Sequence, residues 1–291
     1  MADRSALEAA AAAGLINTEQ VGPLHDFLAS APLLAPSGEE DLRFIRNFHD
    51  VFLAIGILLI AVGLSIGIST FVSNAVGLVI GLGALVSAAE GGGKGATLTG
   101  ALLTGACAAG AAGVMWALGE SFARRRRLFL PAIAIVLSLT GFAVVAAAAL
   151  YFGALLGMGF EQNVEWGQLR PEARNGILVA AAAFAIFAPA AFYARFRLPF
   201  SLGLAGAGAA LFAIALCLVV NAEATLEFLP ALYIGLGALL FFAGVAFDAR
   251  DPARASRFSD NGFWLHFAAA PLILNGAFGL VGQAFAGKAG G

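Results

Sequence analysis

The sequence predicts an all-α, polytopic transmembrane helical bundle of about eight spans, preceded by short soluble or interfacial helices. Three observations lead to this fold class. Of the 291 residues, 60% are hydrophobic and only 12% are charged, whereas about 25% of the residues of a soluble domain are charged. The mean hydropathy is +0.90. The long apolar segments lack alternating polar positions, which favours membrane helices over the strands of a barrel.

Composition divides the chain into three parts. Residues 1–50 are the only extended polar part and are expected to form a helical extension. Residues 51–285 are expected to form the transmembrane bundle, and residues 286–291 a short tail. The lipid bilayer is therefore the partner that the composition implies most directly.

Helix signals recur through the N-terminal extension. A first helix is expected to end at Gly14, and Asn17 with Gln20 three residues later predicts a capping box for a second helix. Ser37 is expected to open a third helix, which becomes the amphipathic juxtamembrane helix. Its polar face would carry Arg43, Arg46, Asn47 and Asp50.

Successive apolar segments follow from residue 51. A hydrocarbon core of about 30 Å requires about 20 helical residues, and this length selects eight candidate spans. The predicted spans are 51–70, 73–89, 98–118, 128–155, 176–193, 198–220, 226–247 and 262–285. Seven spans are the alternative, with two crossings instead of three between residues 50 and 120.

Arginine-rich loops predict the orientation, because Lys and Arg collect in cytoplasmic loops. In the eight-span count they follow spans 3, 5 and 7, on one face of a bacterial inner (plasma) membrane. The residues concerned are Arg124, Arg125, Arg126, Arg127, Arg195, Arg197, Arg250, Arg254 and Arg257. Eight spans would place the N-terminus outside, although Arg43 and Arg46 favour a cytoplasmic one.

Small residues at helical spacing predict close helix contacts. Gly63 and Gly67 form a GxxxG pattern in the first span, and Gly153 and Gly157 form another in the fourth. Such patterns let helix backbones approach where lipid supplies no hydrophobic drive. We expect most of these contacts to lie within the chain.

The few polar residues within the spans are the candidate functional positions, because placing such groups in lipid is costly. They are Asn74, Glu120, His266, Asn275 and Gln283. Glu120 is expected to pair with the arginines that follow it. A role in a cavity is the alternative.

His266 lies in the segment "SDNGFWLHFAAAPLILNGAF", six residues after Asp260. Six residues turn a helix by about 240°, so the two side chains do not share a face. Asp260 is therefore predicted to be a helix cap. His266 is predicted to be a hydrogen-bonded structural residue, with a proton-handling or ligand-contacting role as the alternative.

Several function classes find no support in the sequence. The net charge of −2 and the isolated arginine clusters do not indicate nucleic-acid binding. Lys94 is followed by glycine and so does not complete a phosphate-binding loop. Cys107 and Cys217 form no metal-binding or redox motif, and a disulfide between them is less expected than two buried thiols. We expect no cofactor, no metal site and no enzymatic activity.

Several segments resemble known sequences. The segments "AGLINTEQVGPLHDFL" and "DLRFIRNFHDVFLAIGILLIAVGL" resemble the start of a group of predicted bacterial inner-membrane proteins of unknown function. In that group a short helical preface with a Gly-Leu-Ile-x-x-Glu-Gln core precedes multiple transmembrane helices. The segments "WALGESFARRRRLFLPAIAIVL" and "SDNGFWLHFAAAPLI" are similar to others in such proteins. The resemblance implies architecture only.

Two functions follow as hypotheses. In the first, the bundle binds or passes a small solute or ion, with polar residues on the first, second and eighth spans as its lining. In the second, the protein is a non-catalytic structural, regulatory or partner-binding membrane protein that works through its N-terminal helices. A cavity shared by His266, Asn275 or Glu120 would favour the first hypothesis.

Overall fold

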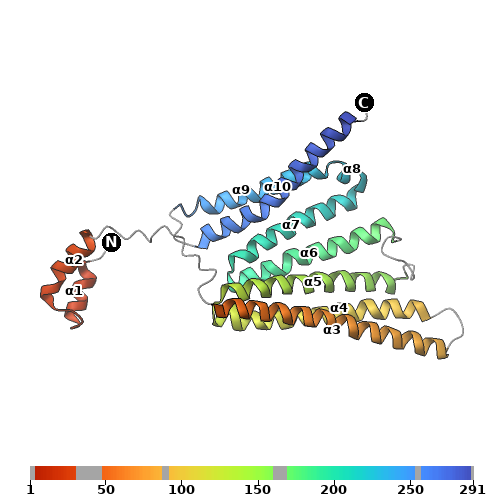
Figure 1. The fold of residues 1–291 in the computed structure, drawn as a ribbon, viewed down its shortest axis with the longest axis horizontal. Helices are drawn as coiled ribbons and strands as arrows, with labels where there is room; N and C mark the ends of the chain where they lie inside the picture. Colours follow the sequence, from red (N-terminus) through yellow and green to blue (C-terminus); the bar gives the residue numbers. More distant parts are fainter. Residues whose placement is uncertain (1–3, 31–47, 87–91, 160–168, 253–256, 290–291) are drawn as a thin grey trace. The chain divides into compact units, whose positions relative to one another are not determined.

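The structure is a computed structural model, and it describes residues 4–30, 48–86, 92–159, 169–252 and 257–289 (Figure 1). The chain forms two compact units, Met1–Phe48 and His49–Gly291. Both units consist of helices, and the described ranges contain no strand. The predicted juxtamembrane helix lies outside the described residues up to position 47.

Short helices make up the N-terminal unit. Helix α1 spans Arg4–Ala12 and is followed by Gly14, whose φ of +72° is the left-handed conformation that glycine adopts without strain. A 3₁₀ turn at Thr18–Gln20 leads into α2, Val21–Ser30. The side-chain oxygen Oε1 of Gln20 accepts a hydrogen bond of 3.0 Å from the backbone N–H of Asn17. The predicted end of the first helix and the predicted capping box are both confirmed.

The second unit contains seven helices long and apolar enough to cross a membrane, counted over the described residues. The protein is thus an all-α polytopic membrane bundle. The helices are α3 (Phe48–Val86), α4 (Gly92–Gly119), α5 (Phe129–Gly157), α6 (Pro171–Phe196), α7 (Pro199–Val220), α9 (Leu229–Asp248) and α10 (Arg257–Ala289), with a short α8 at Ala222–Glu227. Helix α10 continues beyond residue 285, where the last span was predicted to end.

The described residues contain seven such helices, as in the seven-span alternative, rather than the predicted eight. Segments 51–70 and 73–89 are not two crossings, because both lie in the continuous 39-residue helix α3. A helix of that length extends about 58 Å, roughly twice the hydrocarbon core. Ser73 and Asn74 lower the local hydropathy but do not break the helix, since neither residue removes a backbone donor as proline does.

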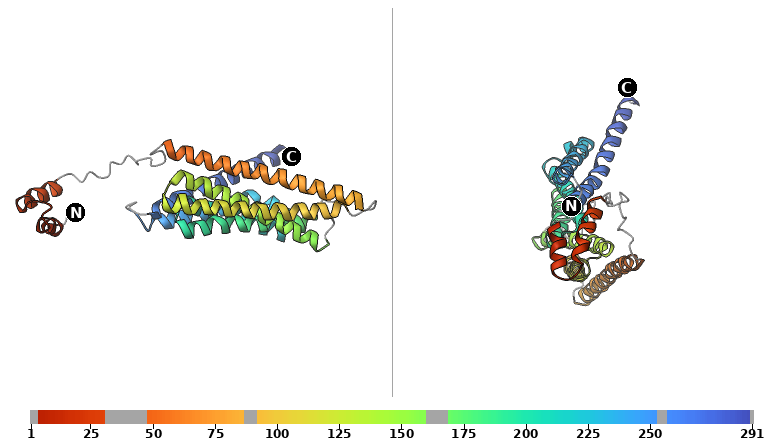
Figure 2. Two further views of the ribbon diagram at one scale, coloured as in Figure 1. Left: turned by 90° about the horizontal axis from the view of Figure 1, so that it is seen from below. Right: turned by 90° about the vertical axis from the view of Figure 1, so that its left-hand side faces the viewer.

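Antiparallel neighbours follow one another across the bundle from α4 to α7, and α9 and α10 pack against each other beside α7 (Figure 1). The largest buried cluster lies among α4, α5 and α6 and includes Met115, Ile135, Val136 and Phe192. The ring of Trp116 meets that of Phe192 edge-on at 6.2 Å. Helix α3 lies along one edge of the bundle and is its least buried span (Figure 2).

Glycines set the closest helix contacts. A methyl group on Gly208 of α7 would collide with the backbone carbonyl of Ala185 in α6. On α9, Gly237 faces Ile273, and on α10, Gly276 faces Ile234, so each glycine receives a larger side chain of its partner. These pairs fix the register of the α9–α10 hairpin.

The glycines of the GxxxG pattern in α3 do not lie at close helix contacts. A methyl group on Gly63 or Gly67 would meet no neighbouring atom within 4 Å, whereas one on Gly153 would contact Leu102. The expectation of contacts within the chain is therefore correct for Gly153 and wrong for Gly63 and Gly67. Ala61, Leu64 and Ile68 of α3 do pack against the main buried cluster, so the open space is confined to the face that carries these glycines.

With seven spans, the arginine-rich turns follow α4, α6 and α9, which are the second, fourth and sixth spans rather than the third, fifth and seventh. All three turns lie at the same end of the bundle (Figure 1), which is called the arginine end below. The chain enters α3 at this end, so the corrected count removes the conflict with the flanking charge of Arg43 and Arg46. Arg254 lies outside the described residues.

Candidate functional site

The five candidate polar residues do not converge on one site. His266 lies between α9 and α10, and Glu120 lies at the end of α4. Asn74 is exposed on α3. Asn275 and Gln283 are exposed along α10, beyond His266. Among the described residues, His266, Asn275 and Glu120 therefore do not line one shared cavity, which would have favoured a pathway through the bundle.

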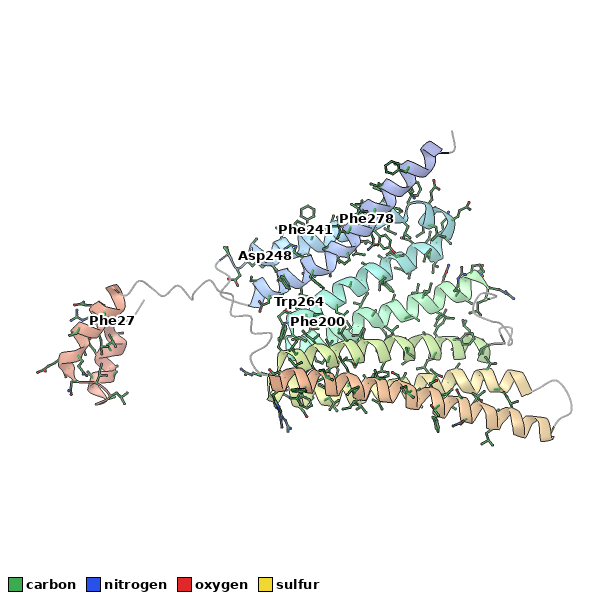
Figure 3. All side chains as sticks on the ribbon, viewed as in Figure 1. Phe27, Phe200, Phe241, Asp248, Trp264 and Phe278 are labelled. Atoms are coloured by element: carbon green, nitrogen blue, oxygen red, sulfur yellow. The ribbon has the colours of Figure 1, made fainter. Side chains whose placement is uncertain are left out.

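His266 has a partner on the neighbouring helix. Its ring nitrogen Nε2 lies 3.0 Å from Oδ2 of Asp248, the last residue of α9. The imidazole also packs on the ring of Phe241, at 4.7 Å between centroids. Figure 3 shows Asp248 at the end of α9, with Phe241 further along the same helix. The prediction of a hydrogen-bonded histidine is confirmed.

Two glycines make room for this pair. A methyl group on Gly244 of α9 would lie 2.7 Å from Cε1 of His266, and one on Gly262 of α10 would collide with the carboxylate of Asp248. The His266 side chain is 27% exposed and that of Asp248 is 44% exposed. The remaining ring nitrogen, Nδ1, is buried and has no hydrogen-bond partner. We call these four residues the Asp–His site.

Asp260 is not the cap that the sequence predicts. Helix α10 begins at Arg257, so Asp260 lies within its first turn, where a carboxylate still favours the helix dipole. Asn261 is consequently inside the helix and is only 2% exposed. Its side-chain nitrogen Nδ2 donates to the hydroxyl of Tyr193 on α6 at 2.8 Å, while its Oδ1 has no partner.

Glu120 joins two helices at the arginine end. It opens a π-helical turn, Glu120–Arg125, that continues α4. Its carboxylate accepts hydrogen bonds from Arg195 of α6 at 2.8 Å and from Arg124 at 3.3 Å. The predicted pairing with the following arginines is confirmed for Arg124, and Arg195 adds a link that sequence spacing could not reveal.

The polar residues of the outer half of α10 have local partners. Asn275 donates to the carbonyl of Pro271 in its own helix at 2.7 Å. Gln283 donates to the carbonyl of Glu227, at the end of α8, at 3.2 Å. Both side-chain amides thus donate structural hydrogen bonds to backbone carbonyls and do not line the groove described below.

A groove that the sequence did not predict lies between α3, α4 and α5. Its volume is about 580 Å³, within the range of small-molecule sites. Hydroxyl-bearing and apolar residues line the groove. None of the five candidate polar residues is among them. The lining residues are Leu58, Ala61, Val62, Ser65, Ile68, Ser69, Val72, Ser73, Thr104, Ala108, Ser138, Gly141, Phe142 and Val145.

Three hydroxyls in the groove have a defined orientation. Ser65 donates to the carbonyl of Ala61 at 2.9 Å, and Thr104 and Ser138 donate to carbonyls of their own helices at 2.8 Å. A hydroxyl that donates in this way keeps two lone pairs as acceptors. Ser65, Ser69 and Ser73 also recur every four residues and so follow one face of α3.

The described residues contain no group of three or more His, Cys, Asp or Glu side chains that could hold a metal ion. Cys107 and Cys217 are free thiols. Comparison of the chain with family models, with curated proteins and with solved structures gave no match.

Proposed function

We propose that this multi-pass membrane protein binds a small, uncharged, mainly apolar solute in the groove between α3, α4 and α5. The solute would carry at least one hydrogen-bond donor. The observation that carries the proposal is the groove of about 580 Å³ with five hydroxyl-bearing residues among its lining. We propose binding within the groove rather than passage of an ion through the bundle.

The lining argues for an uncharged ligand. Its described residues carry no ionisable side chain, and an ion placed among hydrocarbon without a counter-charge costs several kcal/mol. The hydroxyls argue for a donor on the ligand. Ser65, Thr104 and Ser138 already use their protons on carbonyls and can only accept from a bound molecule.

The depth of the groove supports a site for a solute rather than for a lipid headgroup. Ser65 and Ser69 lie near the middle of α3, Thr104 near the middle of α4, and Gly141 near the middle of α5. In helices that span a bilayer, these positions are far from either interface. Binding sites of membrane proteins for small solutes commonly lie at this depth.

Variants that fill the groove test the proposal. Gly141 lines it, and a side chain there meets no neighbouring atom within 4 Å at its Cβ, so Gly141→Phe should fold and occupy the space. The probe is a photoreactive phenol bearing a diazirine, applied to the protein in lipid nanodiscs. We expect labelled peptides from α3 and α5, and a loss of labelling of at least about tenfold in the variant, or about 1.4 kcal/mol.

Gly113→Phe is the matched control, because Gly113 is exposed on α4, has the same open surroundings and does not line the groove. It should label like the unmodified protein. A second probe with a methyl group in place of the phenol hydroxyl tests the need for a donor and should label weakly. Equal labelling of Gly141→Phe and Gly113→Phe, or of the two probes, would contradict the proposal.

We also propose that the arginine end faces the cytoplasm of a bacterial inner membrane. Eight basic residues lie in its described turns or helix ends, namely Arg124, Arg125, Arg126, Arg127, Arg195, Arg197, Arg250 and Arg257. The described turns and helix ends at the opposite end carry four, namely Lys94, Arg170, Arg174 and Lys288. The asymmetry follows the positive-inside rule.

A further inference from the structure

We propose that Asp248 and His266 form a proton-binding site, and that proton uptake at Nδ1 of His266 opens the contact between α9 and α10 to water. The site lies outside the groove and is independent of the proposed solute. It stands on the 3.0 Å contact between the two side chains, the two glycines that accommodate them and the enclosed ring nitrogen.

The geometry identifies the proton acceptor. With Asp248 ionised, Nε2 of His266 carries a proton and donates it to Oδ2, so the lone pair of Nδ1 remains available. A proton taken from water onto Nδ1 converts a neutral imidazole beside a carboxylate into an ion pair. The net charge of the site changes from −1 to zero, and no other bond is formed or broken.

The surroundings couple this proton to helix separation. Nδ1 is enclosed against Gly244, where even a methyl group would come within 2.9 Å of it. A protonated Nδ1 left without an acceptor in this space would cost about as much as a lost hydrogen bond. Water must therefore reach Nδ1 when it is protonated, and the contact between α9 and α10 must loosen at Gly244 to admit it.

Asp248 supplies the route and the charge. Its carboxylate is the more exposed member of the pair and lies at the arginine end, where α9 ends (Figure 3). The other ionisable side chain of α9 is Tyr233, more than three turns away, and α7 carries only Cys217. On α10 itself, Arg257 and Asp260 precede the site by nine and six residues. Tyr193 of α6 contacts α10 through Asn261, about 140° around the helix from His266.

The test follows His266 and the two helices separately. In a His25→Gln, His49→Gln background, His266 is the only imidazole, so ring resonances recorded as the pH is lowered from about 8 to about 5 show whether it binds a proton. Over the same range, hydrogen–deuterium exchange is compared at equal intrinsic exchange rates in peptides covering residues 241–250 and 259–268. We expect His266 to gain one proton at low pH, with exchange in these peptides rising at least about threefold.

His266→Gln keeps a side-chain N–H for Asp248 but takes up no proton, so it should fold and lose the pH dependence of exchange. Asp248→Asn should weaken proton uptake because the carboxylate is gone. Asp50→Asn, at the start of α3, is the matched control and should behave like the background protein. The proposal is wrong if His266 gains no proton over this range, or if exchange in His266→Gln still depends on pH.

Discussion

Replacing Gly208 with alanine is expected to separate α6 from α7 and to destabilise the bundle severely. The added methyl group would overlap the carbonyl oxygen of Ala185 and lie 2.6 Å from its carbonyl carbon and 3.0 Å from the backbone nitrogen of Ile186. All three are backbone atoms, so no side-chain rotation relieves the overlap. Overpacking of a well-packed core typically costs about 1–3 kcal/mol, and we expect the upper part of that range or more.

Thermal unfolding in detergent, followed by the fraction of monodisperse protein, measures this effect. The matched control is Gly235→Ala on α9, an exposed helical glycine whose Cβ would meet no neighbouring atom within 4 Å. There the same change adds helix propensity and no overlap, so stability should stay equal or rise by up to about 1 kcal/mol. If both variants lost stability alike, backbone contact between α6 and α7 would not be the cause.

The sequence located the helices well because hydropathy is a local property. Six of the eight predicted spans correspond one to one with helices, from α4 to α10. The sequence-based prediction failed for α3, where the hydropathy falls at Ser73 and Asn74 as it does at a turn between two spans. Such a local fall in hydropathy ends a helix only if the backbone hydrogen bonds stop there. The amino-acid composition of a short segment does not show whether they do.

Side-chain contacts between different helices could not be predicted from the sequence for a different reason. Asp248 pairs with His266 because the register of the α9–α10 hairpin places Gly244 and Gly262 opposite them. Packing between the two helices sets that register, and local periodicity does not reveal it. Asp260, the nearer acid, was correctly excluded as a partner by helix geometry alone. Glycines spaced along both helices were the available signal.

The groove was missed because its lining is ordinary residue by residue. Serines and threonines that bond to their own helix are common in membrane spans. They line a groove only because α3, α4 and α5 leave space between these faces. The sequence suggested polar lining on the first two predicted spans, and Ser65, Ser69 and Ser73 of α3 do line the groove. No residue of the last predicted span lines this groove.

Cysteine labelling across the membrane is expected to give an all-or-none result that separates seven spans from eight. In a Cys107→Ala, Cys217→Ala background, single cysteines replace Ser5, Ser121 or Glu223, and a membrane-impermeant maleimide is added to intact cells. With seven spans and the arginine end inside, cysteines at positions 5 and 121 are shielded until the cells are opened. The cysteine at position 223 is labelled at once, because it lies in α8 at the opposite end.

The labelling at positions 5 and 121 distinguishes seven spans from eight. Two crossings between them, α3 and α4, return the chain to its starting side, whereas three crossings would leave it on the other. An eight-span protein with the same arginine orientation would therefore label at position 5 and not at position 121. Labelling at both 5 and 121, with 223 shielded, would keep the seven-span count but reverse the orientation. In that case the arginine asymmetry would not determine the topology of this chain.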